Sequence, residues 1–165
     1  MYGSIQEFLQ DWKNENEATL KIMHNLTDVS LSQKVYAEGR TLGYLAWHIT
    51  TSITEMLGRI GLSFNGFEEN APAPKSAKEL AAAYEKAALA VTEQVSKWDV
   101  KKLAEEDDMY GEMWSKNMTL HVLIRHQIHH RAQMTVLMRQ AGLKVPGVYG
   151  PSKEEWAAMG IPAQA

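Results

Sequence analysis

Histidines are the residues of this chain whose type and spacing point most directly to chemistry. Six are present, and three of them, His126, His129 and His130, lie close together in one segment. His126 and His130 are four residues apart, so on a helix their imidazoles stack over successive turns and can reach one metal ion. The chain has no cysteine, which excludes zinc-thiolate sites and any thiol nucleophile of its own. Metal ligands must therefore be histidines or carboxylates.

The segment around this pair predicts that both rings face inward. With successive residues about 100° apart, His126 and His130 fall on the apolar face of the helix or at its edge, whereas His121 and His129 point away. A buried histidine can simply form a hydrogen bond to a neighbour. Burying two rings also penalises the charged form of each, a problem that a shared cation would remove. The pair alone leaves both interpretations open.

A metal site needs at least a third ligand, which in a helical protein comes from a facing helix. His48 is one candidate, although it lies off the main apolar stripe of its segment, and His24 is a weaker one. Glu55, two turns after His48 on the same flank, could be a fourth ligand or support the ligands. The alternative for Glu55 is a surface acid paired with Arg59.

Four long segments with helical periodicity must position these residues. They are predicted at about 4–26, 41–60, 76–98 and 120–141. Ser76 and Glu79 form a capping box at the start of the third segment, and Gly142 is placed to end the fourth. A short last helix is expected after Ser152.

This order of elements predicts an all-α protein, a four-helix bundle with a short extra C-terminal helix, forming a single domain over residues 1–165. The segment 99–119 is expected to be a long ordered loop and a candidate wall of the site. Val122 and Val136 are placed on outer helix faces, which allows a homodimer without requiring one.

Composition limits the partners and the compartment. The net charge is −3 and the basic residues are scattered, so no nucleic-acid surface is expected. No apolar run approaches the roughly 20 residues of a membrane span, and acidic residues interrupt the N-terminus, unlike in a signal peptide. We expect a cytoplasmic protein.

Two stretches of the sequence resemble the DinB superfamily of metal-binding four-helix bundles, which includes the DinB/YfiT-like proteins. They are 42–49 (LGYLAWHI) and 126–133 (HQIHHRAQ), and the order and spacing of the helices agree over nearly the whole chain. The resemblance implies a three-histidine site formed by His48, His126 and His130. Ala132 stands where family members often have glycine, a small change that should leave the site intact.

The resemblance also implies an activity. Characterised relatives include transferases and isomerases that use bacillithiol, mycothiol or glutathione. We therefore expect one divalent metal ion, zinc or nickel, and a thiol cosubstrate that attacks a small electrophile. Arg131 could orient a carboxylate of that cosubstrate, or could instead pack its stem and pair with a nearby acid.

Two other functions remain open from the sequence. One is a metal-dependent hydrolase that uses metal-bound hydroxide, with Glu55 as the proton shuttle. The other is a non-enzymatic, metal-binding stress-response protein of the DNA-damage-inducible type, in which the metal braces the bundle.

Overall fold

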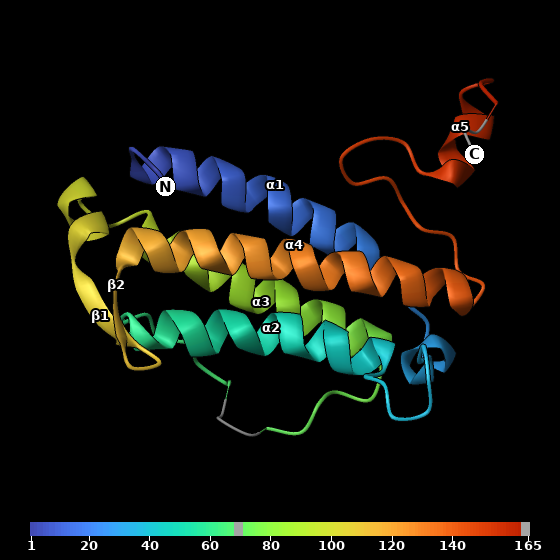
Figure 1. Cartoon of the computed structure of the whole chain (residues 1–165), viewed down its shortest axis with the longest axis horizontal. Coiled ribbons are helices and arrows are strands. Elements are labelled where there is room, and N and C mark those ends of the chain that lie inside the picture. The colour runs from blue at the N-terminus through green and yellow to red at the C-terminus, as the bar shows by residue number, and fades with distance from the viewer. Residues whose placement is uncertain (68–70, 163–165) are drawn as a thin grey trace.

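The computed structural model describes residues 1–67 and 71–162, and it confirms the predicted fold class (Figure 1). The main helices are α1 (Ile5–Met23), α2 (Leu42–Arg59), α3 (Ala77–Val95) and α4 (Lys116–Gln140), and a short α5 (Lys153–Ala158) follows. A 3-10 turn, η1 (Val29–Ser32), lies between α1 and α2. Within the described residues, no helix combines the length and apolar character needed to cross a membrane.

The four long helices form a closed bundle around one hydrophobic core. α1 packs against α3 and α4, and α2 packs against the same two helices from the other side. α2 and α3 run in one direction and α1 and α4 in the other, as the colour gradient in Figure 1 shows. The core between them includes the fully buried side chains of Phe8, Trp12, Ile53, Tyr84 and Met134.

Side chains at the helix ends explain where these helices begin and end. Ser76 precedes α3 and its hydroxyl accepts a hydrogen bond from the Glu79 amide, as predicted. Gly142 follows α4 with φ +75°, a left-handed conformation that favours glycine and confirms its predicted role. The start of α4 differs from the prediction. The Ser115 hydroxyl caps the helix, so α4 begins at Lys116 rather than near residue 120.

The connection between α3 and α4 is a β-hairpin rather than the predicted loop. A 3-10 turn, η2 (Val100–Ala104), leads into β1 (Glu106–Met109), which pairs antiparallel with β2 (Glu112–Ser115). Tyr110 and Gly111 form the two-residue turn, with φ of 63° and 90°. Positive φ at both positions is what a tight hairpin turn requires. The strands carry several acids and no clear alternation, so the sequence gives little strand signal there.

Candidate metal centre

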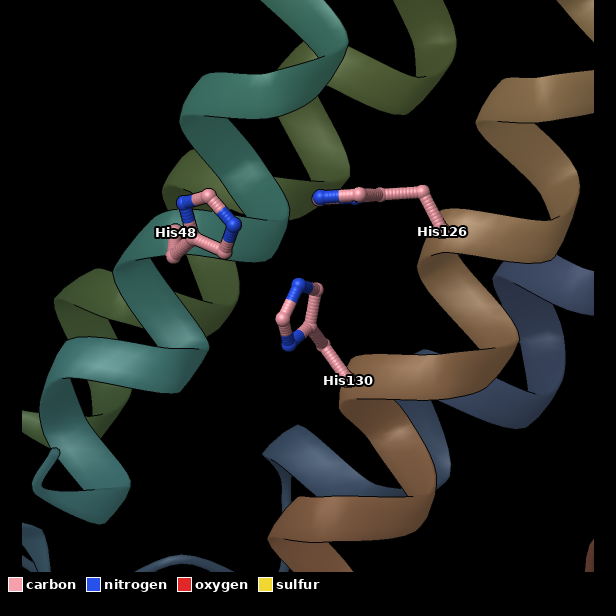
Figure 2. A group of neighbouring side chains, drawn as sticks. All are labelled: His48, His126 and His130. Atoms are coloured by element: carbon pink, nitrogen blue, oxygen red, sulfur yellow. The ribbon is translucent and has the colours of Figure 1, made fainter. Parts of the chain in front are cut away.

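Three histidine side chains meet between α2 and α4 (Figure 2). His48 extends from α2, and His126 and His130 extend from α4. One ring nitrogen from each lies within 4.8 Å of the others. The ring centroids are 4.9 Å apart for His48 and His126, 4.6 Å for His48 and His130, and 4.4 Å for His126 and His130. We call these residues the three-histidine cluster.

The structure separates these three histidines from the others as the helical periodicity and the resemblance predicted. His129 is exposed, and its ring touches that of His130 without joining the cluster. His121 packs its ring against Tyr2, and His24 caps the exposed end of α1. The spacing of four residues on α4 is therefore what brings His126 and His130 together.

A buried glutamine fixes α4 against α2 next to the cluster. Gln127 is fully buried, and its side-chain amide donates to the Ile49 carbonyl at 3.0 Å and to the Ser52 hydroxyl at 3.3 Å. Gln127 follows His126 in sequence and Ile49 follows His48. These hydrogen bonds therefore set the distance between the helices where the rings meet.

A second glutamine orients one ring of the cluster. Gln133 Oε1 lies 2.8 Å from His130 Nδ1, and Gln133 Nε2 lies 3.1 Å from His129 Nε2. Both contacts are hydrogen bonds when His130 carries its proton on Nδ1 and donates it to the amide oxygen. That tautomer leaves a free lone pair on Nε2 of His130, the form in which histidine binds a metal.

The electrostatics of the cluster suit a cation. Burial, followed by the nearby His130 and His48 charges, lowers the pKa of His126 to about 4. Burial is also the main cause that lowers the pKa of His48 and of His130. All three rings are therefore uncharged near pH 7. Each can then offer a nitrogen lone pair to a metal ion, as metal ligands must. His126 Nδ1 is buried without a hydrogen-bond partner among the described residues, the kind of atom that a bound ion or water satisfies. The residues thus fit a divalent metal ion.

Glu55 lies near the cluster but is occupied by other partners. Arg59 Nε lies 2.5 Å from Glu55 Oε1, and the Tyr110 hydroxyl donates to Oε2 at 2.6 Å. The carboxylate is not among the atoms that converge with the three imidazoles. The structure thus shows the alternative arrangement, in which Glu55 pairs with Arg59.

Arg131 points away from the cluster into the interface between α1 and α4. It is 2% exposed, and its guanidinium pairs with Glu15 at 2.6 Å and donates to Thr19 and to the Tyr149 hydroxyl. This is the alternative interpretation of Arg131, an arginine paired with an acid.

Arg40 is a cation near the cluster that the sequence did not reveal. Its guanidinium carbon lies 5.0 Å from the centre of the Tyr44 ring, and Tyr44 stacks on His48 with centroids 5.9 Å apart. After burial and His130, the charge of Arg40 is the next cause that lowers the pKa of His48. Arg40 precedes α2 in a connection without periodicity, so no sequence signal placed it near the site.

A groove of about 980 Å³ opens beside the cluster, and His48 and His126 lie in its wall. We call it the hairpin groove because Tyr110 and Trp114 of the β-hairpin line it, together with α2 and α4. The expectation that the segment 99–119 contributes a site wall agrees with this geometry. Val122 also lines the groove and is only partly exposed, so it does not lie on a free outer face as expected. Val136 lies on an outer face of α4, as expected, and its side chain is 54% exposed.

Solved structures with the same fold include three from bacteria. A DinB-like protein from Bacillus cereus is 48% identical, with a TM-score of 0.86 over 90% of this chain and 100% of that one. A DinB-like protein from Bacillus subtilis, YjoA, is 19% identical, with a TM-score of 0.68 over 86% and 97% of the two chains. A conserved protein from Enterococcus faecalis is 10% identical, with a TM-score of 0.63 over 84% and 97%. The last two show the fold alone.

Sequence comparison gives the same family. The uncharacterized protein YrdA of Bacillus subtilis is 42% identical over 164 residues, which is 99% of this chain and 98% of that protein. The model of the DinB family matches residues 1–164. The chain therefore belongs to the DinB family.

Proposed function

We propose that this protein is a metal-dependent S-transferase that joins a low-molecular-weight thiol, of the bacillithiol kind, through its sulfur to a small electrophile. The observation that carries the proposal is the three-histidine cluster, which borders a groove large enough for a small molecule. Three protein ligands leave coordination positions open, as catalytic sites do and closed structural sites do not. The chain has no cysteine, so the thiol must be a cosubstrate.

The chemistry divides between the metal and the protein. A divalent ion, zinc or nickel, held by His48, His126 and His130 would supply the Lewis acidity that lowers the pKa of a thiol. In the transfer, the thiol sulfur forms a bond to the electrophilic carbon, the leaving group departs with the bonding electrons, and the thiol proton is released. Gln133 keeps His130 in the tautomer that can bind the ion.

Arg40 is the cation that we assign to an anionic cosubstrate. The guanidinium of Arg131 is buried and paired with Glu15, whereas Arg40 is exposed and forms no ion pair within the described residues. Its stacking partner Tyr44 contacts His48. A guanidinium in that position can bind a carboxylate through two hydrogen bonds.

The hydrolase alternative has weaker support because its proton shuttle is occupied. Both carboxylate oxygens of Glu55 accept hydrogen bonds, one from Arg59 and one from Tyr110. Turnover of an ester without added thiol would nevertheless favour hydrolysis over thiol transfer. Metal binding that raises stability without any turnover would favour the non-enzymatic, stress-response alternative.

The test compares metal binding with thiol transfer in the same preparations. Chelator-treated protein is reloaded with zinc or nickel, its affinity is measured by competition with a chromogenic chelator, and conjugation of thiols to chlorodinitrobenzene is followed by absorbance. We expect His130→Ala to lose both metal binding and conjugation, while the matched variant His24→Ala keeps both. Metal-loaded protein that conjugates no thiol would overturn the transferase proposal, and wild-type protein without affinity for either metal would overturn the metal site itself.

A further inference from the structure

We propose that the cosubstrate is an elongated thiol whose carboxylate lies about 10 Å, nearly two turns of helix, from its sulfur. Arg40 and the three-histidine cluster are held about that far apart, with the Tyr44 ring between them. This inference rests on the proposed function for the role of cosubstrate, whereas the binding of such thiols can be tested without turnover.

Three side chains at the start of α2 form a column that ends at the cluster. The Arg40 guanidinium carbon lies 5.0 Å from the centre of the Tyr44 ring. The Tyr44 and His48 rings are stacked, with centroids 5.9 Å apart and planes 15° apart. The three residues follow each other at intervals of four, about one helical turn, so the Tyr44 ring lies between the other two groups. The guanidinium carbon can be no further from the centre of the His48 ring than the sum of the two distances, about 11 Å, which is the rise of about two turns.

Backbone hydrogen bonds fix Arg40 relative to α2. The Leu42 amide donates to the Gln33 carbonyl at 2.9 Å, which ties the start of the helix to the preceding connection. The Thr41 hydroxyl accepts from the Tyr44 amide at 2.9 Å and caps the helix. Arg40 lies between these two anchored points and the connection. Because the backbone is already ordered, little of its freedom is lost when a ligand binds.

Both ends of the column suit negative charge on the ligand. Arg40 is exposed, and a guanidinium binds a carboxylate through two parallel hydrogen bonds. A divalent ion in the three-histidine cluster would favour the thiolate form of a sulfur ligand. Tyr44 is 46% exposed, so its ring can contact the part of the ligand between the two charges. A molecule that spans the column therefore carries a thiolate at one end and a carboxylate at the other.

The length of the column selects among anionic thiols. An extended peptide advances about 3.3–3.6 Å per residue, so a span of about 10 Å corresponds to about three residues. The sulfur and the carboxylate of free cysteine belong to one residue, which is too short to occupy both ends. We therefore expect tripeptide-sized thiols to use Arg40, and cysteine and other short thiols to bind without its help.

The test measures thiol binding to the cobalt-loaded protein, in which sulfur coordination produces an absorption band. Mercaptooctanoate spans the column when extended, whereas mercaptopropionate does not. Each acid is compared with the alcohol of the same length, mercaptooctanol or mercaptopropanol. The ratio of the two affinities reports the carboxylate and removes the contribution of the apolar chain. We expect Arg40→Gln to lower this ratio about tenfold for the long pair, through loss of a charge-assisted hydrogen bond, and by less than about twofold for the short pair.

Two further variants show that position and charge are both read. Arg40→Glu should reverse the preference, so that aminooctanethiol binds more tightly than mercaptooctanoate. Arg125→Gln removes the same charge from an exposed residue next to His126 in sequence, and should leave both ratios unchanged. Equal losses for the long and the short pair in Arg40→Gln, or no loss for either, would overturn the inference.

The outcomes separate this inference from the proposed function. Conjugation of thiols that shows no dependence on chain length or on Arg40 would overturn the inference and leave the transferase. Selective binding of the long acid by a protein that conjugates no thiol would overturn the transferase and leave a site for elongated anionic thiols. Cobalt-loaded protein that shows no sulfur absorption band with any of these thiols would overturn both.

Discussion

Gln133 is the residue that holds the ring of His130 in place within the three-histidine cluster. Its side-chain oxygen lies 2.8 Å from Nδ1 of His130, and its nitrogen lies 3.1 Å from Nε2 of His129. Partners of this kind fix the tautomer and the ring orientation of a metal-binding histidine. The exposed His129 therefore acts on the cluster through Gln133 without being a ligand itself.

Replacing Gln133 by leucine should weaken metal binding while leaving the fold intact. Loss of the hydrogen bond frees the His130 ring to rotate and to change tautomer, so we expect an affinity for zinc about tenfold to a hundredfold lower. Competition with a chromogenic chelator measures this change. Gln140→Leu, at the exposed end of α4, is the matched control. Equal affinities for the two variants would show that Gln133 does not position the ring.

Arg40 should affect the anionic cosubstrate selectively. If its guanidinium binds a carboxylate of the thiol, Arg40→Gln removes a charge-assisted hydrogen bond and should raise the KM for bacillithiol or glutathione about tenfold, with kcat nearly unchanged. The KM for mercaptoethanol, which has no carboxylate, should not change. Steady-state kinetics with both thiols checks this, and an equal effect on the two would refute the assignment.

Among the elements, the hairpin depends on a buried ion pair with the start of α4. Lys116, the first residue of α4, has a side chain only 6% exposed, and its ammonium lies 2.5 Å from the Asp107 carboxylate on β1. Glu105 lies 3.6 Å from the same ammonium. A buried cation that loses its partner is costly, so this contact keeps β1 against the bundle.

Asp107→Asn should therefore loosen the hairpin without unfolding the bundle. We expect faster hydrogen exchange at the hairpin amides and unchanged protection in the bundle core, because local opening is governed by local contacts. Mass spectrometry of exchanged peptides measures both regions. Glu106→Gln, an exposed change on the same strand, should have no effect. Uniform loss of protection across α1 to α4 would instead mean that the pair supports the whole fold.

The elements differ in how well the sequence predicted them, for physical reasons. The long helices were predictable because burial of one face imposes a period of 3.6 residues. The same period selected His126 and His130, whereas His48 lies on a flank of α2 and needed the resemblance. The hairpin was missed because its strands have four residues each and its Tyr110-Gly111 turn lacks the usual Asn-Gly signal. Arg40 was missed because contacts made by a connection have no period.

At the scale of the whole molecule, Glu15 and Arg131 connect three parts of the chain. The pair joins α1 to α4, with both side chains less than a tenth exposed. Tyr149, in the segment that leads to α5, donates its hydroxyl to Glu15 at 2.9 Å and accepts from Arg131. This segment extends beyond α4 and turns back toward α1 in Figure 1. One polar group of contacts thus ties the C-terminal segment to the bundle.

Removal of Arg131 should be among the most destabilising single changes. Arg131→Met leaves the Glu15 carboxylate buried without its partner, which costs about 3–5 kcal/mol. Denaturant unfolding followed by circular dichroism gives the free energy. Arg139→Met breaks an exposed pair with Glu154 and should cost no more than about 1 kcal/mol. Similar losses for the two variants would argue against a structural role for the buried pair.

The stability of the metal-free protein should fall with acidification. Burial, followed by neighbouring charges, lowers the pKa of His126 from 6.5 to about 4 in the folded chain, so between these values the unfolded chain binds more protons. Stability therefore decreases as the pH falls through that interval and is insensitive to this group above it. Unfolding titrations in the presence of a chelator should show this slope, and His126→Asn should reduce it. An unchanged slope would assign the effect to other groups.

The three-histidine cluster and the aromatic side chains of the hairpin belong to different parts of the fold. The three imidazoles belong to α2 and α4, whose spacing the core enforces, whereas Tyr110 and Trp114 belong to the short hairpin segment between α3 and α4. Residues of the hairpin can therefore change the wall of the groove while the bundle keeps the spacing of the three imidazoles. Grafting a hairpin of different sequence onto this bundle would therefore alter the groove and leave the three-histidine cluster in place.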